Sequence, residues 1–337
     1  ARAGGVNVLE EKGYDYSLEH LGRLLQDADY RVINLETVLT NRREKVFADK
    51  DYLHYGDPVK APEAFRRYGP VSFSLANNHT LDHGVAGLLD TFAALEAAKI
   101  PWFGAGRHQA EAARPLLQPL KVGDTTVMLA LFAGFEYRKT YDEKYQFYAT
   151  ADRPGTVRVD AAAVGAAIVE LRKADPHLYT VYFGHWGDNY LWKHTQQTRY
   201  AQELRQAGVD LVIGAGAHMM QEIEHDGRGW VFHSLGNFLF NARGRYARYH
   251  AAPFSYVLMT DFSVEGGTVH VKHRIYPILS DNQLTNYQPR FLTEPEFAAF
   301  AALLSATSHW DADTRAAVQP GRDAIGPYLE LTDVARR

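Results

Sequence analysis

The chain has 337 residues, 46% of them hydrophobic and 23% charged, and this composition is typical of a globular protein with a sizeable core. A formal net charge of −4 and a pI near 6.4 argue against nucleic acid as a partner, because nucleic-acid binding requires a clustered excess of Lys and Arg. The chain has no cysteine, which excludes disulfides, thiolate metal ligands and a cysteine nucleophile.

Strands alternate with helices over the first two thirds of the sequence, which predicts a mainly parallel sheet. Runs of apolar residues predict strands over 30–35, 71–76, 100–103, 126–132, 178–183 and 210–214. Amphipathic spacing predicts helices over 17–25, 61–67, 84–99, 160–174 and 195–207.

After residue 214 the pattern changes to short strands joined by turns such as Asp226-Gly227. These strands are predicted over 222–224, 230–233, 254–262 and 268–276. The fold class expected is therefore α/β, as a four-layer, two-sheet sandwich. We expect a core domain over 1–280 and a C-terminal helical extension over 281–337, with a helix over 294–304.

Polar residues of the types that bind ligands follow four of the predicted strands, at 34–36, 77–79, 184–188 and 214–218. The carboxyl ends of strands in open α/β sheets are where ligands bind, so these four segments are expected to converge. Each also has a structural interpretation, since an acidic residue can cap a turn, Asn is a turn former and a buried histidine can belong to the core. The coincidence of all four favours a site.

With those segments in view the chain resembles the poly-γ-glutamate capsule-synthesis CapA family. The resemblance rests on the runs VINLETVLT, SLANNHTLDHGVAGLLDTFAALEAAKIPWFGAG, HWGDNY, DLVIGAGAHMMQEIE and HSLGNFLF, over about residues 5–305. It implies a fold of the calcineurin-like, metallophosphoesterase type.

The resemblance also implies a site that holds a divalent metal, Zn, Mn or Fe, as one ion or two. The ligands that it implies are Glu36, Asn78, His79, His185 and His218. Of these, Glu36 and His185 are also expected to be catalytic, and His83, four residues after His79, is a further candidate as proton donor.

Two departures from the family pattern bear on this expectation. A Gly-Asp motif that supplies a metal ligand after the first strand is missing, and the chain begins with Ala1 rather than Met, so we expect a segment upstream. Where the family reads Gly-His-His-Pro-His, this chain reads Gly214-Ala215-Gly216-Ala217-His218. A site that lacks ligands can bind a single metal or work without one.

An anionic substrate is expected because Arg243, Arg245 and Arg248 follow the turn that contains Asn237 in a chain of net negative charge. The same arginines also have an interpretation as part of a solvated surface loop. Asn237 and Trp186 are further candidates for substrate binding, although Trp186 has an equally good interpretation as a core residue.

Three functions fit these observations: a metal-dependent hydrolase of an anionic amide or phosphoester, a capsule-polymer binding or accessory protein with a degenerate site, and a metal-free enzyme. The substrate is a small molecule or a polymer. No run of the sequence approaches the roughly 18 apolar residues of a membrane-spanning helix. The compartment, cytoplasmic or extracytoplasmic, and the oligomeric state stay open.

Overall fold

The computed structural model describes residues 2–3, 6–175, 177–266 and 268–332. Its largest sheet has six strands in the order β14-β15-β13-β12-β10-β9. The four inner strands are parallel: β10 (Thr125–Phe135), β12 (Tyr179–His185), β13 (Leu211–Ala215) and β15 (Trp230–Phe232). The two edge strands are antiparallel to their neighbours: β9 (Leu116–Val122) and β14 (Ile223–His225). Inner strands of this kind need apolar side chains on both faces, which is why the sequence predicted them as unbroken apolar runs.

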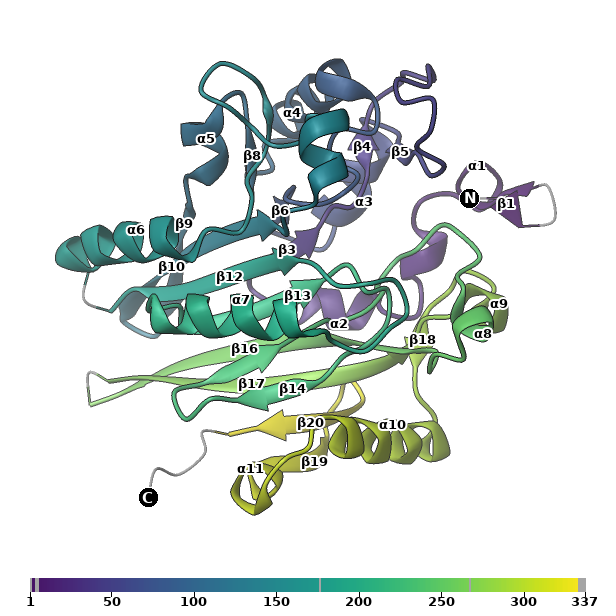
Figure 1. Ribbon diagram of the computed structural model, residues 1–337. Helices are drawn as coiled ribbons and strands as arrows, with labels where there is room; N and C mark the ends of the chain where they lie inside the picture. The colour runs from purple at the N-terminus through teal and green to yellow at the C-terminus, as the bar shows by residue number, and fades with distance from the viewer. Residues whose placement is uncertain (1, 4–5, 176, 267, 333–337) are drawn as a thin grey trace.

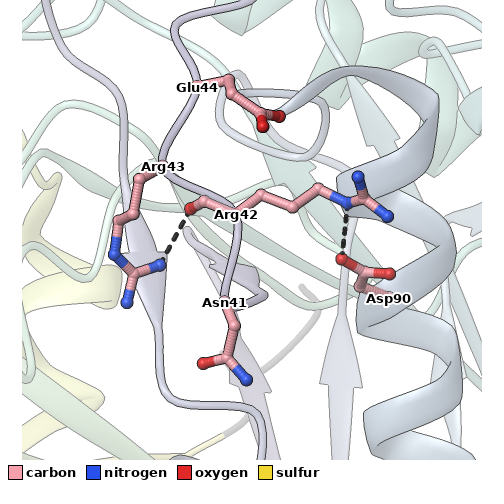
Figure 2. Close-up of a pocket in the computed structure, with 5 residues that line it drawn as sticks. All are labelled: Asn41, Arg42, Arg43, Glu44 and Asp90. Carbon is pink, nitrogen blue, oxygen red and sulfur yellow. Dashed lines mark hydrogen bonds and ion pairs between the residues drawn. The ribbon is translucent and has the colours of Figure 1, made fainter.

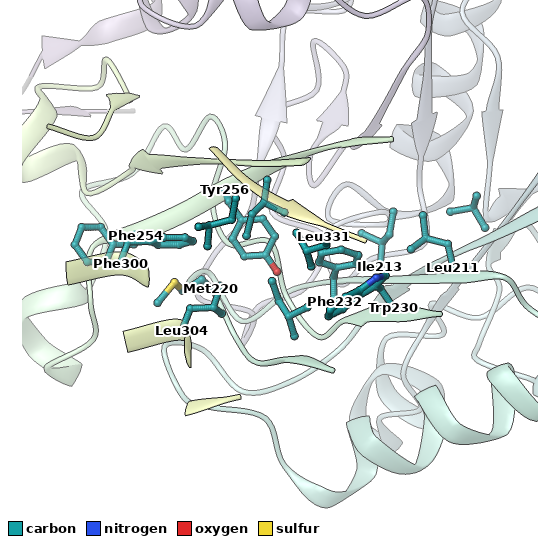
Figure 3. Close-up of a cluster of buried hydrophobic side chains, with 14 of the residues drawn as sticks. Leu211, Ile213, Met220, Trp230, Phe232, Phe254, Tyr256, Phe300, Leu304 and Leu331 are labelled. Carbon is teal, nitrogen blue, oxygen red and sulfur yellow. The ribbon is translucent and has the colours of Figure 1, made fainter. Parts of the chain in front are cut away.

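A second sheet of five strands packs against the first. It contains β16 (Phe254–Glu265), β17 (Thr268–Leu279), β18 (Arg290–Phe291), β19 (Val318–Arg322) and β20 (Pro327–Leu331). The main hydrophobic core lies between the two sheets, where Ile213 and Phe232 of the first share one cluster with Tyr256 and Leu331 of the second (Figure 3). Burial of these side chains is the main force that holds the sheets together.

A third, parallel sheet comes from the N-terminal third of the chain, in the order β3 (Arg31–Asn34), β6 (Val71–Ser74), β7 (Trp102–Phe103). It joins the six-stranded sheet through close packing after β7. Gly104 has φ +85°, and a Cβ atom there would lie 2.8 Å from Cβ of Ala133 in β10. Only glycine permits this approach, which sets the ends of β3 and β6 beside the ends of β12 and β13.

Helices enclose the sheets (Figure 1). The face of the six-stranded sheet opposite the second sheet packs against α6 (Ala161–Ala174) and α7 (Thr195–Gln206), and the third sheet packs against α4 (Gly84–Ala98). Helix α10 (Glu294–Thr307) lies in the chain between β18 and β19 of the second sheet. The side chains of Ser308 and Trp310, which follow it, form hydrogen bonds with the backbone of Ile223 in edge strand β14. The predicted α/β sandwich with two stacked sheets is confirmed.

The shorter elements connect these layers. They are β1 (Arg2–Ala3), β2 (Val6–Asn7), α1 (Val8–Lys12), η1 (Tyr16–Leu18), α2 (Gly22–Gln26), β4 (Val38–Leu39), β5 (Tyr55–Gly56), α3 (Lys60–Arg66), β8 (Ala105–Gly106), α5 (Gln109–Ala113), η2 (Thr140–Lys144), β11 (Gly155–Thr156), α8 (Tyr246–Tyr249), α9 (Asn282–Thr285) and α11 (Ala312–Ala316). None of the helices in the described ranges is long and apolar enough to cross a membrane.

The segment 281–337 differs from the expected helical extension. Besides α9, α10 and α11 it supplies β18, β19 and β20, and β20 pairs with β17 over His273 to Ile275. The segment therefore completes the second sheet, and its apolar residues belong to the main core rather than to a separate one. The division of the chain at residue 280 stays a prediction.

Candidate functional site

Four side chains from four strand ends meet at one point. Glu36 lies two residues after β3, His79 lies between β6 and α4, His185 is the last residue of β12, and His218 follows β13. The Nε2 atoms of His79, His185 and His218 lie 3.8, 3.8 and 3.9 Å from Oε1 of Glu36. The convergence expected from the sequence is therefore present, although these residues come from two different sheets.

Glu36 is the unusual member of this group. Its side chain is 20% exposed, and Oε1 is shielded from solvent without a hydrogen-bond partner. Burial raises the pKa of Glu36, and the nearby His218 opposes that rise. Burial likewise lowers the pKa of His79 and of His185 well below the ordinary value, so both rings are neutral at pH 7. A buried polar atom without a partner is rare in proteins and is a feature of sites that bind something.

The orientation of two of the rings is set by acceptors on their far side. Nδ1 of His79 donates to Oδ2 of Asp82 at 2.6 Å, and Nδ1 of His218 donates to Oδ1 of Asn237 at 2.9 Å. Both rings therefore direct the lone pair of Nε2 toward Glu36. Asn237 thus positions a histidine, and its expected contact with substrate stays a prediction.

His185 differs from the other two histidines. Its Nδ1 faces the amide nitrogen of Asn34 at 3.4 Å, a long contact in which the ring nitrogen accepts. In that arrangement the proton of the neutral ring is on Nε2, which points at Glu36. His185 is therefore placed as a hydrogen-bond donor into the site, and this tautomer does not fit its expected role as a metal ligand through Nε2.

The sequence did not predict the residues that support His79 from the segment 41–55. Asp82 is fully buried; its Oδ1 accepts from Nζ of Lys50 at 2.6 Å, and its Oδ2 accepts from the backbone N–H of His54 at 2.6 Å. Burial raises the pKa of Asp82, and the ammonium group of Lys50 opposes that rise. The segment has no hydrophobic period, so nothing in its pattern indicated a buried lysine at this place.

His54 also forms part of the wall of the site. Its ring stacks on that of His79, with centroids 3.7 Å apart and planes 5° apart. Its Nδ1 lies 3.3 Å from the backbone oxygen of Glu36, and burial lowers the pKa of His54 to about 3. His54 is therefore a neutral ring that holds the loop after β3 against His79.

Three predicted residues lie outside the four-residue group. Asn78, next to His79, has a buried Oδ1 without a partner, so it stays a candidate ligand. His83 is buried at the start of α4 with its ring facing Tyr55 at 6.0 Å, and the structure does not bring it to Glu36. Trp186 is fully buried and its Nε1 donates to the backbone oxygen of His233 at 2.9 Å. The prediction of Trp186 as a substrate platform is wrong, because its ring is part of the core.

The three predicted arginines lie at or near the surface. The guanidinium carbon of Arg245 lies 4.5 Å from the ring centroid of Tyr52, and that of Arg248 lies 5.7 Å from the centroid of Tyr249. Arg243 and Arg248 are exposed and Arg245 is half-buried. The pair of Arg245 and Tyr52 joins the segment 41–55 to the segment 241–250, and the three arginines form a largely solvated rim.

Gly216 explains part of the departure from the family pattern. Its φ is +112°, and a Cβ atom there would lie 2.6 Å from the backbone oxygen of Trp186 and 3.1 Å from Nε2 of His185. The backbone conformation and the lack of space both require glycine. No side chain at this position can therefore act as a ligand in this loop conformation.

One surface hollow lies apart from Glu36 and the three histidines. It measures about 700 Å³ and is lined by Asn41, Arg42, Arg43, Glu44 and Asp90 (Figure 2). Nε of Arg42 lies 2.8 Å from Asp90, and Nη1 of Arg43 donates to the backbone oxygen of Arg42 at 2.8 Å. Arg42, Arg43 and Asp90 thus already have partners within the chain, so the chemistry of the site is better argued from the strand ends.

Comparison with known proteins gives the family. A family model described as bacterial capsule synthesis protein PGA_cap matches residues 3–242. The capsule biosynthesis protein CapA of Bacillus anthracis is 27% identical over 243 residues, covering 69% of this chain and 56% of the relative. The PGA biosynthesis protein CapA of Bacillus subtilis is 27% identical over 236 residues, covering 69% and 59%. A probable polyglutamine synthesis accessory protein of Mycobacterium tuberculosis is 34% identical over 210 residues, covering 58% and 51%.

The chain thus spans less than two thirds of the length of these relatives. A crystal structure of a novel phosphatase from Mycoplasma pneumoniae is similar at 8% identity with a TM-score of 0.32, covering 68% of this chain and 73% of that one, which is too distant to support an argument. The family model spans well over half of the chain and includes all four converging residues. The chain belongs to the bacterial capsule synthesis protein PGA_cap family.

Proposed function

We propose that this protein is a metal-dependent hydrolase of an anionic amide or phosphoester. The observation that carries the proposal is the meeting of three imidazole Nε2 atoms around one buried carboxylate oxygen that has no hydrogen-bond partner. A structural role for these residues would leave that oxygen hydrogen-bonded, since an unpaired buried polar atom costs about 1 to 3 kcal/mol. Four strand ends supply the group, as expected for a ligand site in this class of fold.

The donor set fits a divalent ion. Two ligands that are each about 2.1 Å from the same ion lie roughly 3 to 4 Å apart, and the distances of 3.8–3.9 Å agree with that range. In the described part of the chain no group of three or more His, Asp or Glu side chains is arranged as a ready-made metal site. What supports a metal is the mixed set of carboxylate and imidazole, which suits Zn, Mn or Fe. Glu36, His79 and His218 would be the ligands. Asn78 is a further candidate ligand, and His185 lies beside the group.

The residues have distinct tasks in this proposal. A divalent ion would act as a Lewis acid on the scissile carbonyl or phosphoryl group. Glu36 supplies negative charge, His79 and His218 hold their lone pairs in a fixed direction, and Nε2–H of His185 donates to the substrate oxygen. The loop after β13, with Gly216 in place of a bulkier residue, restricts the ligand set from that side, which favours one ion over two.

His185→Ala provides the first test. We expect the variant to lose hydrolysis of poly-γ-glutamate or of p-nitrophenyl phosphate by at least about 100-fold, because it removes the donor, while its melting temperature changes little. Metal content is measured in the same preparation by atomic emission, and His20→Ala, a change of an exposed histidine, is the control. A parent protein without stoichiometric metal and without either activity would contradict the proposal, and lost folding in His185→Ala would instead support a core role.

If the substrate is anionic, Arg243, Arg245 and Arg248 should contribute to its binding affinity, and this contribution should depend on salt concentration. We expect the triple variant Arg243→Ala, Arg245→Ala, Arg248→Ala to bind poly-γ-glutamate about tenfold more weakly at low salt, with the difference shrinking at 0.15 M salt. The effect is modest because the arginines are largely solvated and each exposed pair contributes only about 0 to 1 kcal/mol. Arg228→Ala, an exposed arginine of the turn between β14 and β15, is the control. If the triple variant and the control bind poly-γ-glutamate equally well, the three arginines do not belong to the substrate site.

A polymer-binding accessory function is the second candidate. It is favoured by the loop of Gly216, which cannot carry a side-chain ligand, and by the name of the Mycobacterium tuberculosis relative. In that case the site grips poly-γ-glutamate without cleaving it. Purified protein that binds the polymer, contains no metal and does not shorten the polymer would decide for this candidate.

A further inference from the structure

His79 is held by a buried chain of contacts that begins outside the predicted site. Its Nδ1 donates to Oδ2 of Asp82 at 2.6 Å, and Oδ1 of Asp82 accepts from Nζ of Lys50 at 2.6 Å. Asp82 is 0% exposed and Lys50 is 6% exposed, so water does not screen either contact. A histidine ligand is commonly oriented by a carboxylate in this way, and loss of such a partner weakens metal binding by about 10 to 100-fold.

Asp82 accepts three hydrogen bonds, and Lys50 is the only one of the three donors that carries a full positive charge. The other two are the neutral ring of His79 and the backbone N–H of His54, which lies 2.6 Å from Oδ2. Without Lys50 a fully buried carboxylate would keep only neutral donors, and a buried charge without compensation is strongly unfavourable. Asp82 would then move away from its present position, and its hold on the His79 ring would weaken.

The contacts of Lys50 differ from those of a lysine that forms an ion pair on the protein surface. Its Nζ also donates to the backbone oxygen of Tyr52 at 3.2 Å, which fixes the turn that carries His54 onto the face of the His79 ring. Surface lysines of the same segment, such as Lys45, do not reach the site. The ammonium group of Lys50 thus supports the His79 ring in two ways. It holds Asp82, which bonds Nδ1 of the ring, and it holds the turn whose His54 stacks on the face of the ring.

We infer that Lys50 is a positioning residue of the site, which acts through Asp82 to fix the orientation and the Nδ1–H tautomer of His79. The inference rests on the proposed function for its catalytic meaning, but the tautomer of His79 can be measured without any metal or substrate.

The test compares the parent, Lys50→Met, Asp82→Asn and the double variant Lys50→Met, Asp82→Asn, with Lys45→Met as the control. Long-range proton–nitrogen spectra of protein labelled on histidine nitrogen report the tautomer, with the His79 signal assigned from His79→Gln. Affinity for Mn²⁺ is measured in parallel by chelator competition. Lys50→Met is expected to populate both tautomers of His79 and to bind Mn²⁺ about tenfold more weakly. Lys45→Met should match the parent in both measurements.

The double variant decides whether Lys50 acts through Asp82. Because both charges are removed together, it is expected to fold even if Lys50→Met does not, and to match Asp82→Asn in tautomer and affinity. An unchanged His79 signal in Lys50→Met would overturn the inference, as would a double variant clearly worse than Asp82→Asn. If the parent binds no Mn²⁺ but its His79 tautomer still depends on Lys50, the proposed metal function fails while the positioning role stands.

Discussion

Glu36→Gln is expected to abolish metal binding and hydrolysis while leaving the metal-free protein at least as stable as the parent. Glutamine keeps the size of the side chain and removes the carboxylate whose Oε1 faces the Nε2 atoms of His79, His185 and His218. Loss of this charge should weaken metal binding by at least about 100-fold, since loss of an outer partner alone costs about 10 to 100-fold.

The sign of the stability change follows from burial. Burial raises the pKa of Glu36 in the folded protein above its value in the unfolded chain. Above both pKa values the unfolded state accommodates the charge better, so the carboxylate lowers the free energy of unfolding. This destabilisation declines as the pH falls below the folded pKa and is gone below the unfolded pKa. The neutral amide removes it at pH 7. Melting temperature without metal and Mn²⁺ affinity are the two measurements, with Glu44→Gln, an exposed glutamate, as control.

Two results would contradict this account of Glu36. A Glu36→Gln protein that binds Mn²⁺ as the parent does would exclude the carboxylate from the site. A variant that melts well below the parent without metal would assign to Glu36 a structural contact that the unpartnered Oε1 does not suggest.

Gly214→Ala is expected to prevent folding or to lower the free energy of unfolding by about 4 kcal/mol or more. A Cβ atom at Gly214 would lie 1.9 Å from the backbone oxygen of His233 and 2.5 Å from Nε1 of Trp186, the two atoms joined by a hydrogen bond. Neither can withdraw, because His233 follows β15 in the sheet and Trp186 is fully buried. Overpacking of a core usually costs about 1 to 3 kcal/mol, and a clash with backbone exceeds that.

Gly326→Ala is the matched control, since a Cβ atom there would meet Phe291 only at ordinary contact distances of 3.4–3.7 Å. Urea unfolding of both variants gives the comparison. If Gly214→Ala unfolds at the same urea concentration as Gly326→Ala, the central strands are more adaptable than this packing implies.

The sequence predicted the elements whose side chains carry a clear pattern. The apolar run before Glu36 became β3, and the amphipathic run after Asp82 became α4. Strand β9 was missed although its side chains alternate between half-buried and exposed and a Gly-Asp turn follows it. Pro119 within it argued against a strand, and the structure resolves this by placing β9 at the edge of the sheet, where a proline is tolerated.

The site was predictable where ligand-type residues follow strands and not where they come from irregular segments. Glu36 and His218 were found from their place after a strand. Lys50 and His54 were not, because a segment without periodicity gives no indication of which side chains turn inward. Asp82 lies two residues before α4, and this position fits a helix cap as well as a hydrogen bond to His79. Only the structure separates the two.

The loop after β13 also constrains how this chain can change over generations. A change that introduces histidine at Gly216 would place its Cβ atom against the backbone oxygen of Trp186, so the loop would have to shift before the new side chain could act as a ligand. A return to the family pattern at this position first requires a shift of the loop backbone. That shift alone adds no ligand, so selection has no reason to favour it. The departure at Gly216 is therefore easier to enter than to leave, and descendants of this chain should retain glycine there.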